Sequence, residues 1–428
     1  MEFHHICVIG LGYIGLPTSS MFASKGIRVT GVDNNAHVIE SLSQGRVHIF
    51  EPGLNEVVKS ARDQGNLLVA SQPVEADAFI IAVPTPFYDE KKADLSYVRS
   101  AAEAIVPVLR PGNLVVLEST SPPLTTREVV QPILERSGLK AGKDFLLAYS
   151  PERVLPGKIM QELVENARVI GGIDDASALA GHDLYHVIVK GEIVLTDATT
   201  AEMVKLMENT YRDVNIAIAM EFSRLADRFG VDIWEALAIA NRHPRVKILN
   251  PGPGVGGHCI SVDPWFLVES APDITPLIRT ARQVNDSQPE FVLQTVKRLL
   301  PDLHGKKVAA LGLAFKPDVD DLRESPAVEV AHLLASAGAV VTACEPFRPD
   351  FSVEGVTVTG SFEEALRDAE FIILLVGHAQ FKALNPAAVA GMTRARLVLD
   401  LVNGFERAAW QNAGFTLERL GDRKNIKA

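Results

Sequence analysis

The sequence predicts an α/β protein in which two Rossmann-like domains, each built on a parallel sheet, are joined by a central domain of long helices. Short apolar strands alternate with helical stretches in the first and last thirds of the chain, as in parallel sheets that are covered on both faces. Neither glycine nor proline interrupts residues 199–229. At 428 residues, the chain also exceeds one ordinary core. We expect domains over residues 1–198, 199–300 and 301–428.

Five continuous apolar runs predict the strands of the first sheet: "HICVI", "RVTGV", "AFIIAV", "NLVVL" and "FLLAY". The loops after the last three runs contain Thr85, Thr120 and Glu152. Ligands bind at the carboxyl ends of parallel strands, so these loops should face one crevice. Thr85 is equally consistent with a helix cap. Glu152 stands beside a proline at a strand end, where a carboxylate has little structural use, and is a candidate functional residue.

A glycine-rich turn, "GLGYIG" at Gly10–Gly15, follows the first strand directly and opens a helix. The first glycine permits the tight turn, the second lets the backbone approach a pyrophosphate, and the third allows the helix to pack closely on the strand. The second strand ends in Asp33, about 20 residues further on, where an acid binds the ribose 2′-hydroxyl and repels a 2′-phosphate. NAD is therefore the expected cofactor rather than NADP.

The uninterrupted middle stretch predicts one helix from Thr199 to Phe229, about eight turns or roughly 45 Å long. A capping box formed by Thr199 and Glu202 should open this helix, and Gly230 should end it. A second helix is expected over residues 233–241. Helices of this length commonly join domains and form dimer contacts, and we expect both roles here.

Polar residues mark one face of the long helix. Lys205 and Asn209 are four residues apart and therefore share a face, which Glu202 and Arg212 extend. Such a face is either a solvated charged stripe or the lining of a cleft. The apolar runs "MVKLM" and "VNIAIAM" around these residues favour the cleft.

Four further apolar runs predict the second sheet: "KVAAL", "AVVTAC", "EFIILLV" and "ARLVLDL", with a helix at "SPAVEVAHLLASAG". Lys316 and Arg323 lie beyond the first of these strands, and two cations at a strand end suit a phosphate-bearing ligand. The second run ends in "CEP" at residues 344–346, at a place where an acidic residue is expected. We interpret "CEP" as a structural divergence from that expected pattern, and Cys344 as a packed thiol.

The segment "NPGPGVGGHC" ends at Cys259. It predicts either a turn with a buried thiol or a loop that presents a reactive one. Most free cysteines are buried and inert, as Cys7 within the first strand should be. Backbone N–H groups exposed by glycines can instead lower the pKa of a thiol and stabilise an oxyanion. Asp263 follows four residues later. On the residues alone, both interpretations stay open.

Composition excludes several classes of protein. The net charge of −11 argues against a general affinity for nucleic acid or anionic membranes. Three cysteines are too few for a disulfide framework or a zinc site, and we expect no metal. The apolar run at residues 371–377 is too short to span a bilayer, and the first residues do not read as a signal peptide. We expect a cytoplasmic protein.

Taken together, the motifs resemble those of the nucleotide-sugar 6-dehydrogenases, the family of UDP-glucose dehydrogenase. The matching segments cover essentially the whole chain: "GLGYIGLP", "VPTP", "EST", "SPERVLPG", "AEMVKLMENTYRDVNIA", "GPGVGGHCISVDP" and "GLAFKPDVDDLRESPA". "SPERVLPG", "GPGVGGHC" and "NRHPRV" are most similar to the branch that acts on N-acetylated amino sugars. The resemblance implies UDP-N-acetylmannosamine as substrate, with UDP-N-acetylglucosamine as the alternative. His258 and Arg153-Val154 depart from the pattern of UDP-glucose enzymes.

The resemblance also implies roles for individual residues. The catalytic set would be Cys259 as nucleophile, Lys205 and Asn209 at oxyanions, and Asp263, Glu152 and Thr120 at protons and water. NAD would be bound by Gly10, Gly12, Tyr13, Ile14, Gly15, Asp33, Thr85, Thr120 and Arg323. The UDP-sugar would be bound by Arg153, Lys205, Asn209, Gly256, Gly257 and Lys316. Arg242 would reach the partner's substrate site in a homodimer, and Arg245 is the alternative, because one extra residue separates Arg242 from Cys259.

The implied reaction is a four-electron oxidation at C6 of the sugar. It would use two NAD per turnover and pass through a cysteine thiohemiacetal and a thioester to a uronic acid for polysaccharide biosynthesis. Covalent capture would retain the aldehyde while the first NADH leaves. A two-electron hydroxyacid dehydrogenase shares the glycine fingerprint but needs neither the cysteine loop nor a third domain. A non-catalytic nucleotide-sugar sensor would be expected to lack Cys259 or Lys205, and both are present.

Overall fold

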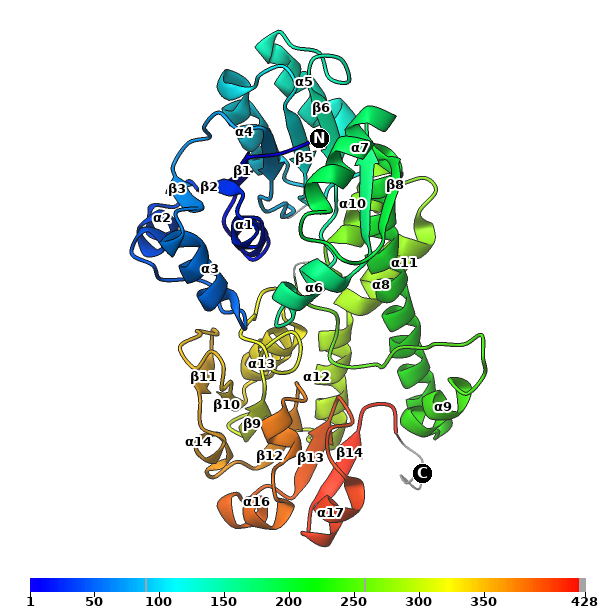
Figure 1. Ribbon diagram of the computed structural model, residues 1–428. Helices are drawn as coiled ribbons and strands as arrows, with labels where there is room; N and C mark the ends of the chain where they lie inside the picture. The colour runs from blue at the N-terminus through cyan, green and yellow to red at the C-terminus, as the bar shows by residue number, and fades with distance from the viewer. Residues whose placement is uncertain (89–90, 258, 423–428) are drawn as a thin grey trace. The chain divides into compact units, whose positions relative to one another are not determined.

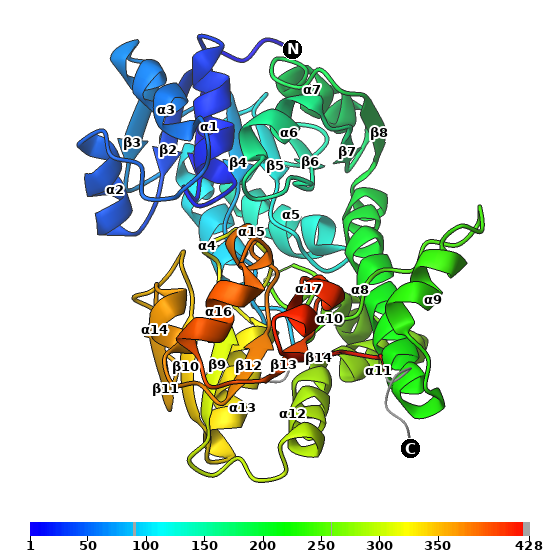
Figure 2. The same cartoon turned by 90° about the horizontal axis from the view of Figure 1, so that it is seen from below.

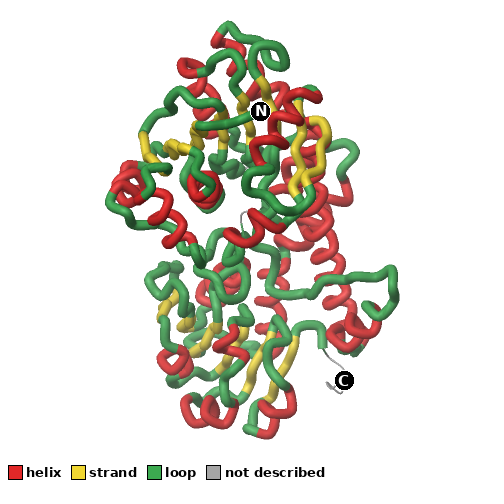
Figure 3. Tube along the Cα trace, viewed as in Figure 1, coloured by secondary structure: helices red, strands yellow, loops and turns green. Residues whose placement is uncertain are grey.

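The computed structural model describes residues 1–88, 91–257 and 259–422 (Figure 1). His258 therefore lies outside the described residues. The chain divides into two compact units. The first comprises Met1–Glu208 and Trp265–Pro272, and the second comprises Asn209–Pro264 and the chain from Asp273 onward. In each unit helices flank a sheet (Figure 3), which confirms the predicted α/β class with two Rossmann-like domains.

An eight-stranded sheet forms the centre of the first unit, in the order β3-β2-β1-β4-β5-β6-β7-β8. Its strands are β1 His5–Ile9, β2 Arg28–Val32, β3 Leu67–Ala70, β4 Ala78–Ile81, β5 Leu114–Leu117, β6 Leu146–Tyr149, β7 Arg168–Gly172 and β8 Ile193–Asp197. The strands from β3 to β6 in this order are parallel, as predicted. The sheet differs from the prediction at one edge. There β7 pairs antiparallel with β6, and β8 pairs parallel with β7.

Helices cover both faces of this sheet, as its continuous apolar strands predict. They are α1 Gly15–Ser24, α2 Ala36–Ser43, α3 Leu54–Asp63, α4 Ser96–Ile105, α5 Gln131–Leu134, α6 Ile159–Glu165, α7 Asp175–Tyr185 and, from Trp265 onward, α10 Asp263–Ser270. Alternate residues of β1 serve different cores. Ile6 and Val8 pack in one core with residues of α1, α3 and α7, whereas Cys7 and Ile9 pack in the other with residues of α4 and α5.

The predicted long helix is confirmed as α8, a single 32-residue helix over Ala198–Phe229 (Figure 2). It begins one residue earlier than predicted, and the expected capping box is wrong. Asp197 fills the capping role, because its carboxylate accepts the backbone N–H of Thr200 at 3.0 Å and the hydroxyl of the same residue at 2.5 Å. Glu202 binds elsewhere in the first unit. The second predicted helix is α9, over Ile233–Ala240.

The second unit contains a six-stranded sheet in the order β11-β10-β9-β12-β13-β14, and all of its pairings are parallel. Its strands are β9 Lys307–Leu311, β10 Val340–Cys344, β11 Val356–Thr359, β12 Phe371–Leu374, β13 Leu397–Asp400 and β14 Thr416–Arg419. Its helices are α11 Pro276–Asp286, α12 Gln288–Leu299, α13 Pro326–Ser336, α14 Phe362–Leu366, α15 Ala379–Lys382, α16 Pro386–Met392 and α17 Arg407–Asn412.

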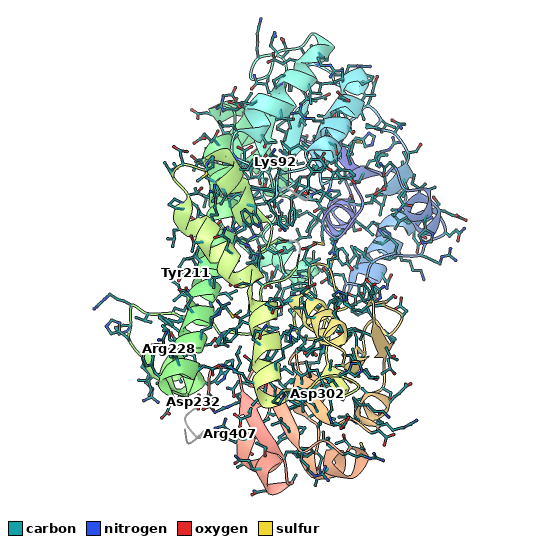
Figure 4. The ribbon with its side chains drawn as sticks, turned by 180° about the vertical axis from the view of Figure 1, so that it is seen from behind. Lys92, Tyr211, Arg228, Asp232, Asp302 and Arg407 are labelled. Atoms are coloured by element: carbon teal, nitrogen blue, oxygen red, sulfur yellow. The ribbon has the colours of Figure 1, made fainter. Side chains whose placement is uncertain are left out.

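An ion-pair network fastens α9 to the second sheet. Arg419 on β14 contacts Asp232, the N-cap of α9, at 2.7 Å, and Asp422 at the same distance. Asp422 also accepts from Arg407 at the start of α17, and Figure 4 labels Asp232 and Arg407 close together. Within the described part of the chain, no helix combines the length and the apolar character that crossing a membrane requires.

Candidate active site

The glycine turn between β1 and α1 has the geometry that a bound pyrophosphate requires. Gly10 has a left-handed backbone with φ of +94°, which glycine adopts without strain. A Cβ atom on Gly15 would lie 1.8 Å from the carbonyl oxygen of Gly10, so α1 can begin this close to the turn only without a side chain. Among the described residues, a Cβ on Gly12 would meet nothing within 4 Å. Tyr13 and Ile14 complete the turn, with Ile14 as the N-cap of α1.

Asp33 follows β2 and holds this turn in place. Its Oδ2 atom accepts the backbone N–H of Leu11 at 2.9 Å, and its Oδ1 atom accepts that of Asn35 at 2.8 Å. Each carboxylate oxygen can accept a further hydrogen bond, so Asp33 can still bind a ribose hydroxyl. The open side at Gly12, the close packing at Gly15 and this carboxylate fit NAD.

The three loops that were expected to share a crevice do lie together in the first unit. The hydroxyl of Thr85 donates to the carbonyl oxygen of Thr120 at 2.6 Å, which joins the loops after β4 and β5. The loops after β5 and β6 are joined by Arg168 of β7, whose guanidinium contacts the carboxylates of Glu118 and Glu152. The sequence did not single out Arg168.

Glu202 of α8 anchors the loop that carries Thr120, which corrects the expectation that its side chain extends a polar face toward a cleft. Its fully buried carboxylate accepts the backbone N–H groups of Leu124 and Thr126, at 2.7 and 2.8 Å, and the hydroxyl of Thr126 at 2.6 Å. Burial raises the pKa of Glu202, and these hydrogen bonds oppose the rise. Arg212, expected on the same face, is exposed.

Lys205 and Arg153 are two cations of the first unit with different surroundings. Lys205 is 9% exposed, and its ammonium forms no hydrogen bond or ion pair with any residue that the structure describes. Burying an unpaired charge is costly, so Lys205 is suited to a negatively charged ligand or intermediate. Arg153 is paired with Glu208 at 2.5 Å and donates to the carbonyl oxygen of Ala167 at 3.0 Å.

Cys259, Asp263 and Asn209 form one group in the second unit. The thiol of Cys259 is exposed, and the carbonyl oxygen of this residue accepts the backbone N–H of Asp263 at 2.8 Å. The amide of Asn209 donates to the carboxylate of Asp263 at 2.5 Å, and both side chains are buried. An exposed thiol therefore stands one helical turn from a buried carboxylate with an oriented amide. This geometry favours the loop that presents a thiol over the buried turn.

The glycines before Cys259 let the loop lie directly on the segment of residues 315–326. A Cβ on Gly256 would lie 2.5 Å from the carbonyl oxygen of Glu324 and 2.6 Å from Cδ of Pro326. The N–H of Gly257 donates to the carbonyl oxygen of Arg323 at 3.2 Å. Side chains at these positions would lift the loop from its seat.

Lys316 and Arg323 belong to that same segment, so the structure places both predicted cations under the cysteine loop. The ammonium of Lys316 lies 5.7 Å from the ring centroid of Phe315. Arg323 contacts Asp321 through two nitrogen atoms, at 2.9 and 2.7 Å. The segment that carries both cations and the loop that ends at Cys259 therefore pack against each other within the second unit.

Arg242 and Arg245 are both exposed on the segment that follows α9. Asn241 closes this segment into a loop, because its side chain donates to the carbonyl oxygen of Ile248 at 2.9 Å and accepts the N–H of Ile248 at 2.8 Å. Neither arginine is favoured over the other by its position in one chain. The assignment to a partner's site therefore stays a prediction for both.

The two other cysteines are buried, as expected. Burial raises the pKa of Cys7 to about 11 and that of Cys344 to about 12. The interpretation of "CEP" as divergence is wrong, because Glu345 is the expected acid. Its carboxylate accepts the backbone N–H groups of Leu313 and Ala314, at 2.8 and 2.9 Å, much as Asp33 holds the first glycine turn.

The fold and the two groups of residues define a dinucleotide-dependent dehydrogenase with a second Rossmann-like domain. Three domain models of the UDP-glucose/GDP-mannose dehydrogenase family match consecutive segments: the NAD binding domain over residues 4–189, the central domain over residues 199–287 and the UDP binding domain over residues 309–407. The chain belongs to the UDP-glucose/GDP-mannose dehydrogenase family. It is an NAD-dependent UDP-sugar dehydrogenase, which confirms the resemblance and the cofactor predicted from the sequence.

Relatives are similar over almost the whole chain. A UDP-N-acetyl-D-mannosamine dehydrogenase of Methanocaldococcus jannaschii is 47% identical over 426 residues, which cover 98% of this chain and 97% of the relative. An NDP-N-acetyl-D-galactosaminuronic acid dehydrogenase of Ralstonia nicotianae is 47% identical over 410 residues, with coverage of 94% and 96%. The solved structure of a UDP-D-ManNAc dehydrogenase from Pyrococcus horikoshii matches with a TM-score of 0.91 and 40% identity, covering 98% of this chain and all of that one.

Proposed function

We propose that this protein oxidises the C6 hydroxymethyl group of UDP-N-acetylmannosamine to a carboxylate, with two NAD per substrate. The name and the full-length similarity of the Methanocaldococcus jannaschii relative support this substrate. One observation above all supports the chemistry. The exposed thiol of Cys259 stands one helical turn from the buried pair formed by Asp263 and Asn209.

When bound, NAD accepts hydride from the sugar carbon in each oxidation step. Its pyrophosphate would lie on the turn at Gly10–Gly15, and its adenosine ribose on Asp33, whose two oxygens already order that turn. Thr85 and Thr120 would flank the nicotinamide end, because their loops are joined at the carboxyl edge of the sheet. We assign Arg323 to the cofactor as well.

Cys259 is the nucleophile in this scheme. The first oxidation removes the hydroxyl proton and a hydride, which leaves an aldehyde at C6. The Cys259 thiolate adds to this carbon, so that a C–S bond forms and negative charge develops on oxygen. We assign the ammonium of Lys205 and the amide of Asn209 to that oxyanion. Loss of a second hydride then converts the thiohemiacetal to a thioester.

Hydrolysis of the thioester completes the turnover. Water attacks the thioester carbonyl, the C–S bond breaks, and the thiolate of Cys259 is restored. Glu152 would take a proton from this water, Thr120 would orient it, and Asp263 would exchange protons at the thiol and the oxyanion. The balance is one alcohol, one water and two NAD⁺ giving one carboxylate, two NADH and three protons.

The UDP-sugar would be held mainly by the second unit. Lys316 lies in the segment beneath the thiol loop, and the backbone at Gly256 and Gly257 is seated on that segment. We assign residues 301–428 to the UDP moiety, residues 1–198 to NAD and residues 199–300 to the connection between them. Arg153 would complete the sugar site.

Purified protein should be tested with NAD and four substrates: the UDP derivatives of N-acetylmannosamine, N-acetylglucosamine, N-acetylgalactosamine and glucose. We expect kcat/KM to be at least ~10-fold higher for the N-acetylmannosamine compound, and two NADH for each sugar consumed. A preference for any of the other three compounds would overturn the proposed substrate. One NADH per substrate would replace the four-electron scheme with a two-electron oxidation.

We also propose that the protein is a homodimer in which α8 lies at the interface. Five large apolar residues on the part of α8 in the second unit are between 39% and 72% exposed: Tyr211, Ile218, Phe222, Leu225 and Phe229. Their spacing of three, four and seven residues places them on one helix face, and Figure 4 labels Tyr211 on this helix. A contiguous apolar stripe of this kind marks an association surface. Arg242, or alternatively Arg245, would reach the partner's substrate site.

A further inference from the structure

A buried charge cluster lies behind Glu152 in the first unit. Arg168 begins β7 and is 5% exposed, with one guanidinium nitrogen 3.2 Å from a carboxylate oxygen of Glu152. A second nitrogen contacts the carboxylate of Glu118, the residue that follows β5. The hydroxyl of Tyr185, at the end of α7, donates to the same Glu118 oxygen at 2.8 Å. Two carboxylates from neighbouring strand ends therefore share one guanidinium.

The guanidinium of Arg168 also contacts Ser150 and Tyr185. Its Nε atom donates to the hydroxyl of Ser150 at 2.8 Å, and its Cζ atom lies 3.9 Å from the ring centroid of Tyr185. β7 runs antiparallel to β6, with Tyr149 opposite Gly171. The first residue of β7 therefore lies at the carboxyl edge of β6, beside the loop that holds Glu152. A parallel strand would have placed its first residue at the opposite edge.

Glu118 differs from an ordinary ion-pair partner. Among the residues that the structure describes, none forms a hydrogen bond with its buried Oε2 atom. Burial raises the pKa of Glu118 to about 7, while Arg168 opposes the rise and Glu152 adds to it. Glu118 is therefore a buried group that shares the guanidinium of Arg168 with Glu152.

We infer that Arg168 is a positioning residue that fixes the carboxylate of Glu152 at the strand ends, and that Glu118 in turn fixes Arg168. The inference rests on the proposed role of Glu152 in taking a proton from water. A hydrogen bond from a guanidinium to a carboxylate adds geometric specificity as well as energy. Because a guanidinium does not give up its proton, Arg168 acts here through charge and geometry, without relaying a proton.

The remaining charges around Glu152 come from two other elements. Glu162 of α6 lines a small recess together with Glu152, Arg153 and Arg168. Arg153 is already paired with Glu208 of α8 at 2.5 Å. Among the described residues, Arg168 is therefore the cation that forms an ion pair with Glu152.

The test is kcat for uronic acid formation and KM for NAD, measured for the parent protein, Arg168→Met, Arg168→Lys and Glu118→Gln. Arg168→Met leaves the carboxylate of Glu152 without its fixed partner, so kcat should fall by about 100-fold. Arg168→Lys keeps the charge but not the forked geometry, so it should restore part of the loss. Glu118→Gln keeps an oxygen for Arg168, so kcat should fall less than in Arg168→Met. KM for NAD should change by less than about threefold.

Two further results keep this inference separate from the proposed function. Glu152→Gln should lower kcat at least as far as Arg168→Met does, and a Glu152→Gln protein with the parent's kcat would contradict the role of Glu152 itself. If Glu152→Gln lowers kcat but Arg168→Met and Arg168→Lys both keep the parent's kcat, the positioning by Arg168 is wrong. Arg168→Lys keeps a cation at this position, and a kcat equal to the parent's for this variant contradicts the inference even if Arg168→Met fails to fold.

Discussion

Gly256→Ala tests whether the seat of the cysteine loop positions the thiol. The added Cβ would lie 2.5 Å from the carbonyl oxygen of Glu324, 2.6 Å from Cδ of Pro326 and 3.0 Å from Cβ of Phe315. Ordinary contacts are about 3.5 Å or longer, and a backbone carbonyl and a proline ring cannot turn aside. The loop must therefore shift by roughly 1 Å, which costs about 1–3 kcal/mol of stability. Misplacement of a reacting group by this distance can lower the rate about 100-fold.

The assay is kcat/KM for the UDP-sugar together with thermal unfolding, and the matched control is Gly252→Ala. Gly252 lies in the same loop, but its Cβ would meet no described atom within 4 Å. We expect Gly256→Ala to lose about 100-fold in kcat/KM, with NAD affinity unchanged, and Gly252→Ala to stay within about threefold of the parent. Equal activities for Gly256→Ala and the parent protein would refute the argument that glycine packing places Cys259.

Three further predictions concern the thiols, Lys205 and the apolar stripe on α8. A thiol reagent at pH 8 should label one cysteine of the native protein and all three after unfolding, because burial raises the pKa values of Cys7 and Cys344 to about 11 and about 12; labelling of either in the native state would contradict their burial. Lys205→Met should lower kcat by about 100- to 1,000-fold while calorimetry still detects UDP-sugar binding, and a normal kcat would remove Lys205 from the oxyanion. Leu225→Asp should shift the mass measured by light scattering from dimer toward monomer, whereas an unchanged dimer would place the interface elsewhere.

Much of the fold was predictable because its signals are local. The glycine turn at Gly10–Gly15, the apolar strands and the uninterrupted stretch of α8 each need only neighbouring residues, and each is confirmed. The direction of β7 was not predictable in this way. A short apolar run such as "RVIGG" does not say which way it crosses the sheet, and the direction depends on how α6 and the loop before it return the chain. Arg168 was missed for that reason, although an arginine that opens an apolar run is itself a signal.

Residues with two possible partners were predicted less well. The spacing of Thr199 and Glu202 matches a capping box, but Asp197 caps α8. Glu202 instead accepts the backbone N–H of Leu124. The competing donors lie 76 and 78 residues away in sequence, a separation that no local pattern reveals. Glu345 was overlooked although it directly follows β10, as Asp33 directly follows β2. In both cases a tertiary contact decided the role of a carboxylate.

The central claim is that Cys259 carries the sugar as a thioester between two oxidations. Rapid acid quench during turnover of UDP-N-acetylmannosamine, followed by mass spectrometry of the peptide that contains Cys259, measures this directly. We predict an acyl adduct on Cys259 that appears with the second NADH and disappears as uronic acid forms, and that is absent from Cys259→Ser, which should also make no acid. Two NADH per sugar without any adduct on Cys259, or normal acid formation by Cys259→Ser, would contradict the claim.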